Sequence, residues 1–139
     1  MKKGFANTEL IIVTLVLAVL LFFTVPKVML LVHKAQEGYT KHELGRMRSA
    51  IAAYYGEHQG VYPTDDLSSL VPEYIEKIPQ AKVPGFAPSN AVSTGSFAQV
   101  FTNAGGWAYV NDPKDKDHFG ELFVNVDMKD SYGKKWLEH

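Results

Sequence analysis

Glu9 is the residue whose position in this chain most needs a chemical explanation. It stands directly before an apolar run, residues 10–25, and behind a short leader that carries Lys2 and Lys3. An ionised carboxylate in hydrocarbon costs about 2.5–3.5 kcal/mol on insertion scales, so it requires a compensating charge. The chemistry that suits this position is ion pairing, and we expect another copy of the same chain to supply the cation.

A second group of chemically capable residues lies in the turn at residues 111–117. Asp112, Asp115 and Asp117 place carboxylate oxygens, which are the ligands that calcium prefers, within one short segment. The spacing does not match an EF-hand loop, and two lysines lie between the acids. A calcium site and a solvated turn without metal both remain open.

The remaining sequence offers little support for catalysis. The histidines lack paired metal-ligand spacing, no serine stands in a nucleophile-elbow pattern, and no glycine-rich phosphate-binding motif is present. The formal net charge of -1 gives no global reason to expect nucleic acid as a primary partner, although Arg46 and Arg48 lie close together. We therefore expect a non-enzymatic protein, with no cofactor other than the calcium considered above.

The apolar run has two simple interpretations. A secretory signal peptide should close with small residues, but Pro26 and Lys27 follow instead. Only one lysine is charged between residues 10 and 32, and its side chain is long enough to reach the headgroups, so the run is long enough to span a bilayer. A transmembrane anchor explains the run better than a cleaved signal, yet neither interpretation accounts for the residues that precede it.

Those preceding residues carry a resemblance to a known family. Residues 4–9 have the sequence Gly-Phe-Ala-Asn-Thr-Glu, and the hydrophobic run that follows is broken by Pro26. This pattern resembles the class III signal of type IV prepilins and type II secretion pseudopilins. The resemblance implies that a prepilin peptidase cuts between Gly4 and Phe5 and N-methylates Phe5, and that Glu9 is the family's glutamate. The three residues before Glu9 are more polar than the usual Thr-Leu-Ile.

The charges in this arrangement suggest how subunits would align. After cleavage, Phe5 would carry an ammonium at the start of a helix, with Glu9 one turn along on the same face. A Glu9 carboxylate that pairs with the Phe5 ammonium of an adjacent subunit would remove both charges from lipid. Because an unmatched charge is costly, such a pair sets the axial register between subunits more than it adds affinity.

Helical periodicity continues beyond the apolar run. We predict one helix from about Phe5 to about His58, which would be ~80 Å long, with a kink at Pro26. We expect a small sheet to pack on the apolar face of its second part, after Val28. The apolar residues that recur at mostly three- and four-residue steps are Val28, Leu31, Val32, Ala35, Tyr39, Met47, Ile51, Tyr54 and Tyr55.

The rest of the chain predicts a small head. Thr64 or Asp65 should cap a short helix, and residues 80–94 should form an irregular loop. Three β-prone runs, residues 97–101, 107–110 and 122–126, predict an antiparallel sheet. The segments Gly-Gly-Trp-Ala-Tyr at 105–109 and Gly-Glu-Leu-Phe-Val-Asn at 120–125 are similar to a hairpin of the same pilin family. The predicted class is α+β, with a long N-terminal helix packed on an antiparallel head.

The resemblance implies a domain plan and a function. The expected parts are a leader at 1–4, a transmembrane and filament-core helix at 5–27, an amphipathic helix at 28–59 and a head at 60–139. The expected function is a type IV pilus subunit for adhesion, motility or DNA uptake. The alternatives are a major pseudopilin of a type II secretion system, a family that often binds calcium in a C-terminal loop, and a membrane-anchored binding domain that does not polymerise.

The same resemblance implies the location and the partners of the chain. The precursor would reside in the inner membrane, and the assembled subunit in an extracellular pilus or a periplasmic pseudopilus. The partners would be other copies of the chain, the prepilin peptidase, and the assembly platform protein and ATPase. The chain contains no cysteine, unlike pilins that close a C-terminal loop with a disulfide.

Overall fold

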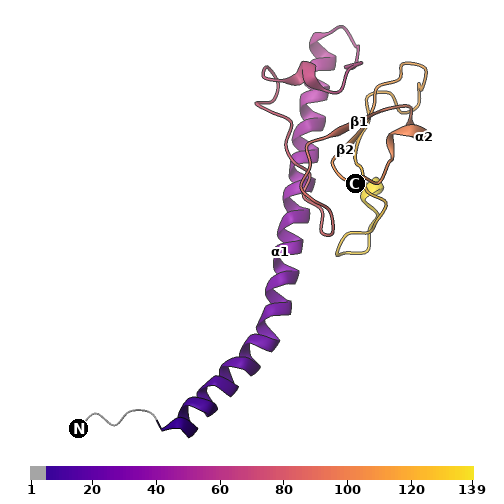
Figure 1. The fold of residues 1–139 in the computed structure, drawn as a ribbon. Helices are drawn as coiled ribbons and strands as arrows, with labels where there is room; N and C mark the ends of the chain where they lie inside the picture. Colours follow the sequence, from indigo (N-terminus) through magenta and orange to yellow (C-terminus); the bar gives the residue numbers. More distant parts are fainter. Residues whose placement is uncertain (1–5) are drawn as a thin grey trace. The chain divides into compact units, whose positions relative to one another are not determined.

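A computed structural model describes residues 6–139 of the chain, and it has an α+β fold (Figure 1). Its main elements are a helix of 51 residues, α1 (Asn7–Glu57), and a sheet of three strands, β1 (Val92–Gly95), β2 (Trp107–Val110) and β3 (Leu122–Val124). A short helix, α2 (Phe97–Val100), and two 3-10 turns, η1 (Ser68–Leu70) and η2 (Trp136–Glu138), complete the fold. The predicted class is confirmed.

The predicted long helix is confirmed over its described residues. Helix α1 continues through Pro26 and ends at Glu57, next to the predicted end at His58. The chain divides into two compact units, Met1–Lys34 and Ala35–His139, so the second unit includes the latter part of α1. The predicted leader and the residues Gly4 and Phe5 lie outside the described part of the chain.

The face of α1 that packs on the head differs from the predicted apolar stripe. Val28 and Tyr39 are exposed, and apolar packing on the helix begins at Leu44. The turns before Leu44 bury polar side chains instead: Glu37 and Thr40 bind loops of the head through hydrogen bonds, and Glu43 pairs with Arg46 of the same helix. The buried residues of α1 are Glu37, Thr40, Glu43, Leu44, Met47, Ala50 and Ile51.

The sheet is mixed, which corrects the prediction of an antiparallel one. Strand β2 pairs with β3 in antiparallel register, as predicted, but it pairs with β1 in parallel register. Strand β1 overlaps the end of the segment predicted to be an irregular loop, residues 80–94, and residues 97–100 form a helix where a strand was predicted. Parallel pairing needs no tight turn between its strands, so no hairpin signal marks β1 in the sequence.

Contacts with residues distant in the sequence explain why the run at 97–101 is helical. The Asp115 carboxylate accepts a hydrogen bond of 2.8 Å from the backbone N–H of Phe97, the first residue of α2. The rings of Phe97 and Phe101, one turn apart, meet edge to face, and both contact Phe123. Tertiary contacts therefore override the strand propensity of this aromatic segment.

The head has a core on each face of the sheet. On one face, Trp107 and Tyr109 pack with Leu44, Met47 and Ile51 of α1. On the other face, Ala108 and Val110 pack with residues of α2. Both large rings are anchored at their polar atoms: Trp107 Nε1 donates to the Pro79 carbonyl at 2.8 Å, and Tyr109 Oη donates to the Pro63 carbonyl at 2.7 Å.

The predicted cap at Thr64 or Asp65 is wrong in its position, because the N-cap residue of η1 is Leu67, which makes no side-chain capping hydrogen bond. The Asp65 carboxylate accepts hydrogen bonds from the backbone N–H groups of Leu67 and Ser69, at 3.0 and 2.9 Å. The element that follows is the single 3-10 turn η1. Its last residue, Leu70, is fully buried and belongs to the core that faces α1.

Candidate assembly segment

The first half of α1 presents an apolar surface on all its sides. Residues 6–32 are all exposed, and Phe22 exposes 77 % of its surface. Within the described residues, α1 is the one helix long and apolar enough to cross a membrane. Covering apolar surface is worth about 25 cal/mol per Å², so this segment favours any environment that removes it from water. A bilayer or the same segment of other copies would provide that cover.

The polar groups inside this segment do not oppose such burial. The Thr14 hydroxyl donates to the Leu10 carbonyl at 2.8 Å, and the Thr24 hydroxyl donates to the Leu20 carbonyl at 2.7 Å. Because both hydroxyls are satisfied within the helix, they enter an apolar environment without leaving a donor unpaired.

Pro26 lies within the last third of the exposed apolar part of α1. With Leu21, Phe22 and neighbouring residues it lines an open apolar hollow of about 710 Å³. The kink predicted at Pro26 remains a prediction. The hollow is a place where side chains of a neighbouring apolar molecule would gain contact area.

Glu9 begins the segment and binds the start of its own helix. Its carboxylate accepts a hydrogen bond of 3.3 Å from the Ala6 backbone N–H, while the Glu9 N–H donates to the Ala6 carbonyl at 2.9 Å. This reciprocal arrangement is the glutamate half of a capping box. The sequence analysis did not predict this capping arrangement, because the cap position holds Ala6 and not the Ser or Thr that marks a capping box in a sequence. The predicted pairing of Glu9 with Phe5 lies partly outside the described residues and stays a prediction.

Two carboxylates of the acidic turn proposed for calcium accept hydrogen bonds from backbone N–H groups. The Asp112 carboxylate accepts from the Lys114 N–H at 2.9 Å, and the Asp115 carboxylate holds the start of α2. Asp117 is exposed. Across residues 6–139, no group of three or more acidic or histidine side chains converges in a way that would hold a metal ion. The calcium hypothesis therefore still depends on a binding measurement.

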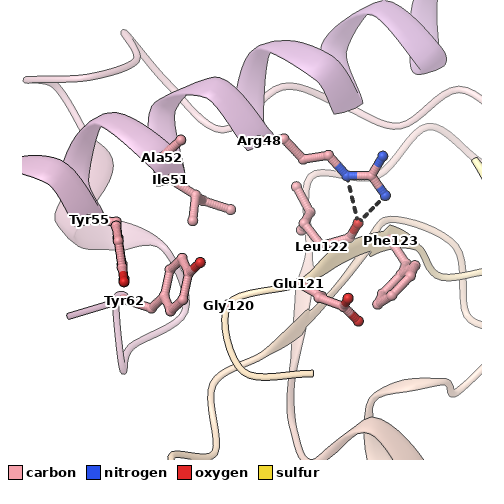
Figure 2. Close-up of a pocket in the computed structure, with 9 residues that line it drawn as sticks. All are labelled: Arg48, Ile51, Ala52, Tyr55, Tyr62, Gly120, Glu121, Leu122 and Phe123. Carbon is pink, nitrogen blue, oxygen red and sulfur yellow. Dashed lines mark hydrogen bonds between the residues drawn. The ribbon is translucent and has the colours of Figure 1, made fainter. Parts of the chain in front are cut away.

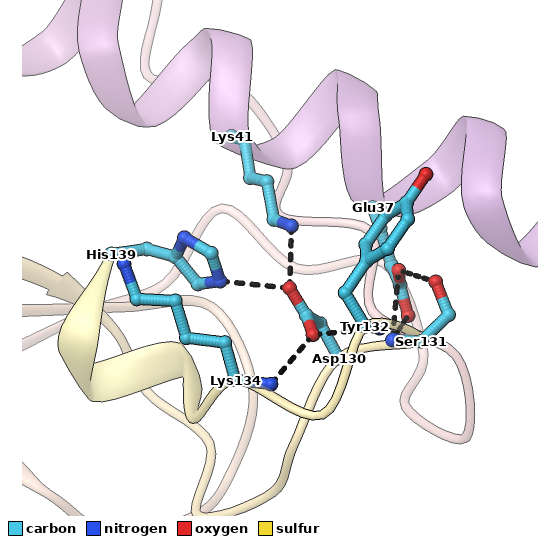
Figure 3. A network of polar contacts seen from close by, with 7 residues as sticks. All are labelled: Glu37, Lys41, Asp130, Ser131, Tyr132, Lys134 and His139. Atoms are coloured by element: carbon cyan, nitrogen blue, oxygen red, sulfur yellow. Dashed lines mark hydrogen bonds and ion pairs between the residues drawn. The ribbon is translucent and has the colours of Figure 1, made fainter.

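Sequence reasoning also missed a polar network that joins α1 to a C-terminal hairpin, residues 129–135 (Figure 3). The Asp130 carboxylate contacts Lys41 Nζ at 2.6 Å and His139 Nε2 at 2.8 Å, and it accepts from the backbone N–H groups of Tyr132 and Lys134. The hydrogen bond from Lys41, followed by those from the backbone, holds the pKa of Asp130 well below its usual range.

A second carboxylate fixes the tip of the same hairpin. Glu37 is 5 % exposed, and its carboxylate accepts from the Ser131 backbone N–H at 3.0 Å and from the Ser131 hydroxyl at 2.5 Å. The carboxylates of Glu37 and Asp130 therefore attach the hairpin to successive turns of α1. We call this network, made of Glu37, Lys41, Asp130, Ser131 and His139, the carboxylate clamp.

A cavity of about 290 Å³ lies between α1 and β3 (Figure 2). Arg48 lies at one end, where its guanidinium donates to the Leu122 carbonyl at 2.7 and 3.1 Å and to the His139 carbonyl at 2.6 Å. Tyr55 and Tyr62 form the aromatic wall, with ring centres 4.4 Å apart. Burial lowers the pKa of Arg48, although its bonds to carbonyls suit the charged form. The arrangement supports packing of the head on α1, and it lacks a nucleophile paired with a base.

Comparison of the chain with known protein families, with curated proteins and with solved structures gave no match. The account of its function therefore rests on its own residues and their geometry, together with the resemblance of its N-terminal motif.

Proposed function

We propose that this chain is the subunit of a helical filament of the type IV pilus kind. The precursor would be stored in the inner membrane and then assembled into an extracellular fibre for adhesion, motility or DNA uptake. One observation carries the proposal: residues 10–32 expose apolar side chains on every side of α1, and an exposed carboxylate, Glu9, marks their start. Such a surface suits two successive environments, first lipid and then other copies of the same helix.

The energetics of transfer from lipid explain why a charge is needed. Lipid tails and a bundle of apolar helices bury the segment about equally, so apolar contact alone does not fix how far one subunit slides along the next. A carboxylate at one level of the helix does fix the axial position of a subunit, because an ionised carboxylate in an apolar environment is costly unless a cation lies opposite it. Glu9 would exchange its weak contact with Ala6 N–H, at 3.3 Å, for a cationic neighbour.

The head would remain folded throughout this transfer. Its core and the carboxylate clamp join the later part of α1 to the sheet and the C-terminal hairpin, using residues of unit Ala35–His139 alone. We propose no enzymatic role for it. The mechanical work of extraction would come from the assembly ATPase and platform protein, and processing after Gly4 from the prepilin peptidase.

A major pseudopilin of a secretion system is the second candidate. The observation that favours it is the way the C-terminal segment is held: the chain has no cysteine, and hydrogen bonds of the carboxylate clamp hold residues 129–135 where a disulfide closes the loop in many pilins. A pseudopilin fibre is short and periplasmic, so the two candidates differ in where mature subunits accumulate.

Variants at Glu9 test the proposed role in assembly. Glu9→Ala removes both the charge and the cap, whereas Glu9→Gln keeps an oxygen that accepts from Ala6 N–H and removes only the charge. We expect both variants to enter the membrane and to reduce the yield of sheared filaments at least about tenfold. A tenfold reduction corresponds to a loss of about 1.4 kcal/mol for each contact between subunits. Glu73→Gln, at an exposed position of the head, is the matched control. Normal filament yield from Glu9→Gln would contradict the role of the charge.

A further inference from the structure

Two loops of the head meet α1 at the turns that follow its apolar part in the sequence. The Thr40 hydroxyl donates to the Lys82 carbonyl at 2.6 Å and accepts from the Lys82 N–H at 2.8 Å. One turn earlier, Glu37 holds Ser131 at the tip of the C-terminal hairpin. The loop around Lys82 and the hairpin 129–135 therefore contact α1 at residues 37–40, which follow the apolar residues 10–32 in the sequence.

These segments expose lysine side chains, whereas the acidic side chains beside them are buried and bound within the head. Lys129 and Lys134 flank the hairpin tip and are both exposed, and Lys82 is half-buried. The acids at the same level, Glu37 and Asp130, are 5 % and 6 % exposed, and both are bound within the carboxylate clamp. The exposed charge of the hairpin is therefore carried by lysine ammonium groups.

Tyrosine side chains accompany the lysines. Lys82 Nζ lies 4.5 Å from the centre of the Tyr39 ring, and Lys41 Nζ lies 5.4 Å from that of Tyr132. Tyr132 is 75 % exposed at the hairpin tip, where Figure 3 shows its ring beside Lys41 and Glu37. Tyrosine combines an apolar ring with a polar tip and is enriched at the level of lipid headgroups, where lysines reach phosphate.

We propose that Tyr39, Lys82, Lys129, Tyr132 and Lys134 form a surface that binds the anionic headgroups of phospholipids. The proposal rests on the proposed function in one respect, namely that residues 10–32 are embedded in a bilayer before assembly. The headgroups would then meet the helix at the turns where this surface begins. Binding would retain the head on the membrane, and extraction into the filament would have to release it.

The experiment uses the full chain reconstituted in two kinds of vesicle, phosphatidylcholine alone and phosphatidylcholine mixed with phosphatidylglycerol. Hydrogen–deuterium exchange is followed in peptides that cover residues 129–135 and, as an internal reference, residues 112–118. The double variant Lys129→Gln/Lys134→Gln is compared with Lys114→Gln/Lys116→Gln, which removes the same charge from two exposed lysines of the acidic turn. Flotation with the vesicles reports membrane insertion separately.

We expect phosphatidylglycerol to slow exchange at residues 129–135 but not at 112–118, and high salt to abolish the effect. One lysine near an anionic surface strengthens binding about fivefold, so Lys129→Gln/Lys134→Gln should weaken it up to about thirtyfold while the control retains it. Three results would overturn the proposal. Residues 129–135 could exchange at the same rate in both kinds of vesicle, or both double variants could lose the protection equally. DNA could also protect residues 129–135 where the lipid does not. A chain that does not float would overturn the proposed function as well, whereas flotation without protection overturns only the lipid surface.

Discussion

Lys41 Nζ lies 2.6 Å from Asp130 Oδ2, so a turn of α1 is tied directly to a hairpin that follows 89 residues later in the chain. Asp130 is buried, and four donors from Lys41, His139 and the hairpin backbone surround its carboxylate. A buried charge with this many partners is stable only while the partners stay in place. The contact therefore couples the conformation of the C-terminal segment to that of the helix.

This coupling predicts how the stability of the head depends on pH. The pKa of Asp130 in the folded chain lies below its usual value, so the folded state holds its carboxylate ionised where the unfolded chain takes up a proton. The stabilisation is complete above about pH 4, the ordinary pKa of aspartate, and is lost as pH falls further. We expect the free energy of unfolding, measured by denaturant titration in detergent, to decrease below about pH 4.

Substitution of the same carboxylate separates its contribution from that of other acids. Asp130→Asn should lower the free energy of unfolding at pH 7 by about 3 kcal/mol and should flatten its decline in acid. Asp127→Asn, at an exposed position three residues earlier, should change neither. An Asp130→Asn variant with wild-type stability and an unchanged acid slope would show that the clamp does not stabilise the head.

Gly106 provides a test of the parallel pairing. Its φ is +74°, and a Cβ at this position would lie 2.5 Å from the carbonyl oxygen of Ala91, next to β1. Gly133 also has a positive φ, +82°, but a Cβ there would meet no atom within 4 Å. Gly133→Ala should cost about 1 kcal/mol, the strain of a left-handed residue, and Gly106→Ala clearly more. Equal melting temperatures for the two variants would contradict the close approach of β1 and β2.

The sequence predicted those elements whose signals are local. Helix α1 follows from apolar residues at helical spacing, and the β2–β3 pairing follows from two short β-prone runs separated by glycine, proline and acidic residues. Strand β1 was missed because Val92–Gly95 is short, lies among loop-forming residues and pairs with a strand that no tight turn connects to it. The helix at Phe97 was missed because its start depends on Asp115, which lies 18 residues away.

The sequence likewise predicted one part of the candidate site, Glu9, and not the other, the carboxylate clamp. Glu9 stood out because a carboxylate beside an apolar run is unusual in itself. The clamp could not be found, because Glu37 and Asp130 look like ordinary surface acids until folding places Ser131 and Lys41 beside them. The apolar stripe was placed too early on α1 for a related reason: Glu37 and Thr40 are buried by hydrogen bonding, which hydropathy does not detect.

A calcium titration decides the role of the acidic turn. Asp112 and Asp115 already accept hydrogen bonds from backbone N–H groups, and Asp117 is exposed, so we expect the melting temperature to be the same with calcium and with chelator. Circular dichroism of the detergent-solubilised chain measures it. A rise with calcium that Asp112→Asn/Asp117→Asn abolishes would establish a site and would favour the pseudopilin over the pilin.

The central claim, that this chain is processed after Gly4 and assembled through Phe5 and Glu9, is tested most directly by mass spectrometry of the N-terminal peptide. Filaments sheared from the cell surface are compared with the membrane fraction of the same cells. A methylated Phe5 as the first residue in the sheared fraction is the predicted result. Mature Phe5 confined to the membrane fraction would indicate a pseudopilin instead. An intact leader from Met1 to Gly4 in both fractions would contradict the account and favour an anchored domain that does not polymerise.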